Sequence, residues 1–146
     1  MTGPLPSVQT VLTTDDLLAL QARVDRVYVD PAVHEYAVRL ATATRAPRIV
    51  GLPDLARYIT FGASPRASIN LVLTARALAH LRGREYVLPL DVRDMAHDVM
   101  RHRLVLSFEA YADGMTSDGI LSSIVEHVPP PSVQPRPPAD ARLVNA

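Results

Sequence analysis

The sequence predicts a mainly α-helical domain, a small bundle of about five helices with room for a short two-stranded β element. Apolar residues recur every three to four positions in several segments, as in helices that bury one face. These segments open with Thr, Asp or Ser followed by an acid or a proline, which is typical of helix starts. The 146 residues, 48% of them hydrophobic and 21% charged, suffice for one ordinary core.

Three helices are expected in the first part of the chain. The first begins at Thr13 or Thr14, with Asp15 and Asp16 in its first turn. It should bury a stripe made of Leu17, Leu20, Val24 and Val27. The second follows Asp30 and Pro31, a cap and a first-turn proline, and its periodic residues are Val33, Tyr36, Ala37, Leu40 and Ala41. After an irregular stretch over 45–51, a short helix is expected over 53–61 and ends at Gly62.

The longest helix is expected between Ser64 and Gly83, with Pro65 in its first turn. Its most apolar face carries Ala67, Leu71, Ala75 and Leu78. Asp91 is expected to cap the next helix, whose apolar residues are Val92, Met95, Ala96, Val99 and Met100. Residues 104–108 are predicted to form a strand. Thr116 and Asp118 open a last helix that buries Ile120, Leu121, Ile124, Val125 and Val128.

Proline and glycine divide the chain into three parts. Residues 1–12 have little periodicity and resemble a connector from an upstream domain. The folded domain is predicted over 13–128. Residues 129–146 hold six of the thirteen prolines and no apolar periodicity, so polyproline-like or disordered behaviour is expected there.

Composition excludes several kinds of chemistry. Every one of the fifteen basic residues is Arg, and the fifteen acids balance them, so no net field favours nucleic acid or an anionic membrane. The absence of Lys excludes a phosphate-binding P-loop and a Schiff-base lysine, and the absence of Cys excludes disulfides and Cys-ligated zinc. No apolar run is long enough to span a membrane, and the opening does not resemble a targeting signal, so we predict a cytoplasmic protein.

The most informative segment is Gly62-Ala63-Ser64-Pro65-Arg66. It combines a glycine, a candidate serine cap and a first-turn proline with a cation at the helix start, where the helix dipole disfavours positive charge by a few tenths of a kcal/mol. Open N–H groups beside a guanidinium would make a good phosphate receptor. The alternative is that Arg66 pairs with an acid of a neighbouring loop.

This segment resembles the sensor-two motif of MoxR-type AAA+ ATPases. Other segments are similar to the same family in the same order: Tyr36 with Ala43-Thr44-Arg45, Gly83-Arg84-Glu85-Tyr86-Val87, Asp91-Val92 and Arg101-His102-Arg103. The resemblance implies a C-terminal lid, in which Arg66 reaches the nucleotide γ-phosphate. It implies that catalytic residues lie in an upstream AAA+ core of the same chain, and that this part alone is no enzyme.

The resemblance also carries expectations about cofactors and partners. ATP and Mg would bind the full-length parent, with none bound to this part alone. The parent would form a homo-hexamer with a chaperone-like role in complex maturation, with a von Willebrand A-type protein as a further partner. No nucleic-acid or membrane partner is expected.

Weaker candidates have structural explanations beside the functional ones. Tyr36 could edge an adenine pocket, although such a tyrosine is more often a core residue. Asp98 and His102, with His97 nearby, suit a helix-end ion pair better than a metal site, and no metal site is predicted. The alternative function is a stand-alone helical adaptor or DNA-binding module, whose basic residues would be Arg93, Arg101 and Arg103.

Overall fold

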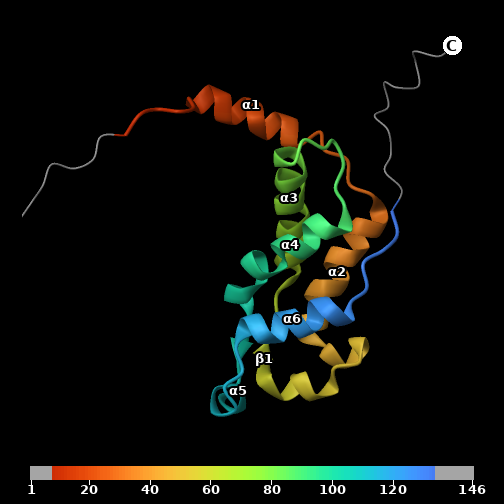
Figure 1. The fold of residues 1–146 in the computed structure, drawn as a ribbon. Helices are drawn as coiled ribbons and strands as arrows, with labels where there is room; N and C mark the ends of the chain where they lie inside the picture. Colours follow the sequence, from red (N-terminus) through yellow and green to blue (C-terminus); the bar gives the residue numbers. More distant parts are fainter. Residues whose placement is uncertain (1–7, 134–146) are drawn as a thin grey trace, which may run out of the picture.

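In the computed structural model, the described residues 8–133 form a bundle of helices with a small two-stranded sheet (Figure 1). The α helices are α1 (Thr14–Val24), α2 (Pro31–Arg45), α3 (Pro65–Leu81), α4 (Pro89–Met100), α5 (Phe108–Ala112) and α6 (Ser117–His127). Three 3₁₀ segments connect them, η1 (Pro47–Val50), η2 (Pro53–Tyr58) and η3 (Arg101–Arg103). Strands β1 (Ile59–Phe61) and β2 (Val105–Leu106) pair antiparallel. The mainly α fold with a short β element is confirmed.

The core lies between four helices. α3 packs against α2 and α4, and α6 packs across α4 and α2, as Figure 1 shows. The bulkiest apolar side chains that are fully buried come from all four: Tyr36, Leu40, Leu71, Met100, Ile120, Leu121 and Ile124. Every residue of the predicted α6 face is buried, so the apolar period identified this helix correctly.

Helix starts follow the predicted capping chemistry in three places. Asp30 accepts a hydrogen bond from the Ala32 N–H at 2.8 Å, and the Thr116 hydroxyl accepts one from the Gly119 N–H at 3.1 Å. Thr13 and Asp16 form a capping box at the start of α1. Each bond satisfies a backbone donor that the first helical turn leaves open.

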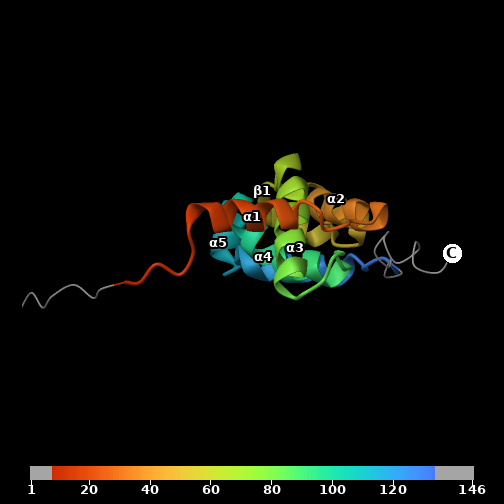
Figure 2. The same ribbon diagram turned by 90° about the horizontal axis from the view of Figure 1, so that it is seen from above.

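The predicted buried stripe of α1 is only partly correct, since Leu20 and Val24 are half-buried and Leu17 is exposed. No residue of α1 is buried, and Leu17 and Leu18 are 52% and 62% exposed. Val27 is buried, but it follows the end of the helix. α1 extends away from the bundle and meets it near the far end of α3 (Figures 1 and 2). Its apolar residues therefore have little to pack against within residues 8–133.

The expectations for residues 45–61 and for α3 were only partly correct. The irregular stretch contains η1, and the predicted short helix is η2 followed by β1, because the chain turns to pair with β2. In α3, Leu78 is half-buried, whereas Val72 and Ala79 join the core.

Two expectations between α3 and α6 were only partly correct. Asp91 is not at the cap position of α4, because this helix begins at Pro89; it is the third helical residue, and its carboxylate accepts from the Leu88 N–H at 2.8 Å as in a capping box. The predicted strand over 104–108 is reduced to β2, because the Ser107 hydroxyl accepts from the Ala110 N–H and opens α5. With only five residues, α5 is too short to show a helical period.

The predicted division of the chain is tested by these residues only in part. Residues 129–133 contain no helix or strand, and the remainder of the predicted tail and residues 1–7 of the predicted connector lie outside the described range. Among residues 8–133, no helix combines the length and apolar character that a membrane crossing requires.

Asp91 is a fully buried acid held by two arginines from the turn after α3. Arg84 donates to both carboxylate oxygens at 2.6 and 2.7 Å, and Arg82 donates to one of them at 2.8 Å and to Asp94 at 2.7 Å. Burial alone would raise the pKa of Asp91, but the hydrogen bonds from Arg84, the Leu88 N–H and Arg82 hold it below its usual range. This network ties the end of α3 to the start of α4.

We expect Asp91→Asn to destabilise the chain by about 2 kcal/mol at neutral pH, because it removes the buried carboxylate that accepts charge-assisted bonds from the partly exposed Arg82 and Arg84. The lowered pKa means that the carboxylate stabilises the fold above its unfolded pKa and loses this effect as the pH falls below about 5. In urea unfolding followed by circular dichroism, the difference between variant and wild type should shrink with falling pH. Asp94→Asn, which removes a half-exposed acid, is the control with a smaller loss.

Candidate lid site at the start of helix α3

Arg66 is the second residue of α3, and its side chain is exposed. It makes no ion pair or hydrogen bond with any residue in the range 8–133. The alternative that a neighbouring acid neutralises it is therefore wrong for this part of the chain. Its guanidinium is available to a ligand from outside the domain.

The backbone at the start of α3 also leaves a donor open. Ser64 occupies the cap position with extended geometry, but its hydroxyl accepts no capping bond, so the predicted serine cap is wrong in this respect. Pro65 has no N–H, and the Ala67 N–H donates to the Ser64 carbonyl at 2.8 Å. Within the described residues the Arg66 N–H is unpaired, so one backbone donor and one guanidinium share this helix end.

Gly62 lies directly against the end of α2. A Cβ atom at this position would lie 2.7 Å from the Arg45 backbone nitrogen, and closer still to the Thr44 carbonyl group. Only glycine permits this approach of two backbones. The segment that leads into α3 is thus docked on α2, which fixes where the helix start lies.

An apolar groove runs along α3 and α2, and Arg76 is the cation in its lining. Ile69 and Leu73, which are 59% and 49% exposed, follow Arg66 on the same helix face at spacings of three and four residues. With His34 and Val38 of α2 they line a groove of about 330 Å³. Arg66 shares a helix face with Ile69 and Leu73 but does not line the groove itself.

Tyr36 does not join this site. Its side chain is 1% exposed, and its hydroxyl finds no hydrogen-bond partner among the described residues. Desolvation raises the pKa of the hydroxyl, while Arg93 and Arg39 act in the opposite direction. The burial supports a core role, and an adenine contact stays a prediction that would require the core to open.

The other candidate residues are engaged within the fold. Asp98 pairs with Arg101 at 2.8 Å, so the expected ion pair between Asp98 and His102 is wrong, and His97 bonds to the Ser122 hydroxyl. Arg101 also approaches Asp118, and Arg103 donates to the Val99 carbonyl. Across residues 8–133, His and acidic side chains form no group of three that could hold a metal ion.

Comparison with known proteins places this arrangement in a family. Residues 54–124 match the AAA lid domain model. The chain is 41% identical to the chaperone MoxR1 of Mycobacterium tuberculosis over 132 residues, which are 90% of this chain and 35% of that protein. It is 46% identical over 84 residues to the MoxR protein of Paracoccus denitrificans, covering 55% of this chain and 25% of the relative. This chain belongs to the AAA lid domains of the MoxR family.

A solved structure supports the same assignment for this MoxR-type lid. A candidate ATPase from Cytophaga hutchinsonii superimposes with a TM-score of 0.81 at 35% identity, covering 85% of this chain and 38% of that one. The chain spans between a quarter and two fifths of the length of these relatives. The family membership does not favour the stand-alone adaptor or DNA-binding alternative.

The sequence pointed to Arg66 but gave no independent reason to select Thr44 or Arg45. Both were noted only within the Ala43-Thr44-Arg45 match to the family. In the MoxR-type lid they contact Ala63, a residue 18 or 19 positions further along the chain. Helical periodicity carries no information on such a contact, because it reports only which residues share a helix face.

We expect Gly62→Ala to destabilise the lid by about 1–3 kcal/mol, because the added methyl group would overlap the α2 backbone. Thermal and urea unfolding measure the loss. Gly119→Ala in α6 is the control with the smaller expected loss, since its methyl would meet only the Thr116 hydroxyl, at 3.3 Å, and no backbone atom. Equal stability of Gly62→Ala and wild type would show that the two backbones are not in close contact.

Proposed function

We propose that this domain is the lid of a MoxR-type AAA+ ATPase, and that Arg66 provides the sensor-two contact to ATP. The observation that carries the proposal is the state of Arg66, which is exposed at a helix start and unpaired within residues 8–133. A cation there is unfavourable unless an anion approaches it. A nucleotide phosphate is an anion of suitable charge and geometry for a guanidinium.

The residues present fit a phosphate group. The Arg66 guanidinium and its backbone N–H can both donate to phosphate oxygens, and neither has an internal acceptor to release first among the described residues. ATP with Mg²⁺ would supply the phosphoanhydride bond that is hydrolysed. The role of Arg66 would be to bind and orient the terminal phosphate and to stabilise negative charge that develops there.

The remaining parts of such an ATPase would belong to an AAA+ core of the same polypeptide. This chain has no Lys for a P-loop, so the phosphate cradle must come from elsewhere. The groove of α2 and α3 offers apolar surface on which a core could pack. We further propose a chaperone-like role, as the name of the Mycobacterium tuberculosis relative suggests. The resemblance also leads us to propose a homo-hexamer, a role in complex maturation, and a von Willebrand A-type protein as a partner.

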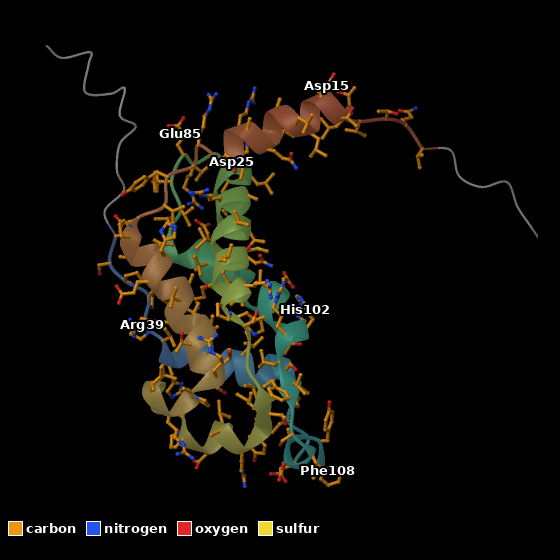
Figure 3. All side chains as sticks on the ribbon, turned by 180° about the vertical axis from the view of Figure 1, so that it is seen from behind. Asp15, Asp25, Arg39, Glu85, His102 and Phe108 are labelled. Atoms are coloured by element: carbon orange, nitrogen blue, oxygen red, sulfur yellow. The ribbon has the colours of Figure 1, made fainter. Side chains whose placement is uncertain are left out.

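In a protein that contains both lid and core, we expect Arg66→Ala to lower ATP turnover about 100-fold, because a positioned donor to developing charge contributes on this scale. The turnover of Arg66→Lys should lie between that of Arg66→Ala and that of the wild type, since Lys keeps the charge but not the forked geometry. Arg39→Ala is the control, since Arg39 lies exposed on the outer side of α2 (Figure 3). Wild-type turnover of a folded Arg66→Ala protein would refute the sensor assignment.

We expect the isolated lid to bind ATP weakly or not detectably in titration calorimetry. One guanidinium and one helix end, without a metal or a phosphate cradle, supply too few contacts to offset the entropy lost on binding. Micromolar or tighter affinity, abolished by Arg66→Ala, would contradict the division of the site between lid and core.

A further inference from the structure

Both backbone polar groups of Ala63 are hydrogen-bonded to side chains of the last turn of α2. Its N–H donates to the Thr44 hydroxyl at 2.8 Å, and its carbonyl accepts from the Arg45 guanidinium at 2.8 Å. Ala63 and Thr44 are both fully buried. Neither bond belongs to the backbone pattern of a helix or a sheet, so both depend on the side chains of Thr44 and Arg45.

The Thr44 hydroxyl has a defined orientation. It donates its only hydrogen to the Ala41 carbonyl at 2.7 Å, which leaves its lone pairs for the Ala63 N–H. The Arg45 side chain is fixed in a similar way, because its other terminal nitrogen, Nη2, donates to the Thr42 hydroxyl at 3.3 Å. Both partners of Ala63 are therefore anchored to α2 itself.

α3 has no side-chain cap, and these contacts instead hold in place the residue that precedes its cap position. Ser64 makes no side-chain capping bond, so nothing at the cap position itself fixes the first turn. Only Ser64 and Pro65 separate Ala63 from Arg66, and the proline ring fixes its own φ angle. With Gly62 pressed against α2 as well, a shift of Ala63 would pass directly to Arg66.

We infer that Thr44 and Arg45 are positioning residues for Arg66, which set where its guanidinium meets the nucleotide. The inference rests on the proposed sensor function of Arg66. Neither residue needs to touch ATP: each acts through the Ala63 peptide. Because the Ala63 N–H needs an acceptor, the position of Arg66 should depend on a hydroxyl at position 44 and not only on the volume of that side chain.

The test is a double-mutant cycle of ATP turnover in the protein with lid and core. Thr44→Val removes the hydroxyl at similar volume, and Arg45→Ala removes the guanidinium. Each should lower turnover about tenfold, as expected for misplacement of a reacting group by less than 1 Å. In the Arg66→Ala background neither should lower it further, and Thr44→Ser should restore the wild-type rate.

A purely structural role predicts a different result. Thr74→Val is the matched control, because its hydroxyl also bonds to a helix carbonyl, that of Asn70, but does not touch the Ala63 segment. A loss of stability without misplacement of Arg66 would lower the turnover of Thr44→Val equally with or without Arg66. Thr74→Val, at a half-buried position, shows the cost of losing one hydroxyl bond to a helix carbonyl. Amide hydrogen exchange of Ala63, whose N–H is bonded to Thr44, gives a second measurement, which should accelerate only in the position 44 and 45 variants.

The outcomes separate the two proposals. If Arg66→Ala lowers turnover but Thr44→Val and Arg45→Ala do not, or if their effects add to that of Arg66→Ala, the positioning inference is overturned while the sensor function stands. If Arg66→Ala leaves turnover unchanged, the sensor function itself fails. Should Thr44→Val not fold, Arg45→Ala tests the inference, because Arg45 is an exposed side chain.

Discussion

The contact between the last turn of α2 and the Gly62-Ala63 segment determines how the rest of the domain is arranged. It joins two helices at the point where the chain changes from β1 to α3, and it involves backbone on both sides. Backbone groups buried at such a crossing must find partners, since an unpaired one costs about 1–3 kcal/mol. Thr44 and Arg45 provide those partners, which allows a non-helical segment to lie against a buried helix end.

The other end of α3 is fixed by a different kind of interaction. There Arg82 and Arg84 bind the buried carboxylate of Asp91, so charge-assisted hydrogen bonds connect the end of α3 to the start of α4. α3 is thus attached to α2 at its start and to α4 at its end. A helix held at both ends can present its exposed face, from Arg66 through Ile69 to Leu73, as one rigid surface.

Local sequence patterns predicted the elements whose burial follows from their own period. α2, α3 and α6 were placed correctly, because capping residues and an apolar stripe specify them without reference to the rest of the chain. The stripe of α1 was misjudged because the same period occurs in a helix with almost no surface to pack on. Asp91 was assigned to a cap since sequence shows an acid near a helix start, but not the two arginines that bury it.

At the site, Arg66 could be selected from its anomalous position, whereas the contacts of Thr44 and Arg45 depend on a crossing that no local pattern specifies.

The arginines of this domain differ in where their counter-charges lie. Arg82, Arg84 and Arg101 each find an acid within a few residues or across one helix contact, and these pairs account for their positions. Arg66 stands where the helix dipole opposes it, and residues 8–133 supply it with no acid. Under the proposed sensor function, the anion that compensates this cation is a phosphate held outside the domain. A lid that closes over a separately bound phosphate meets this requirement, whereas a self-contained helical adaptor gives no reason for it.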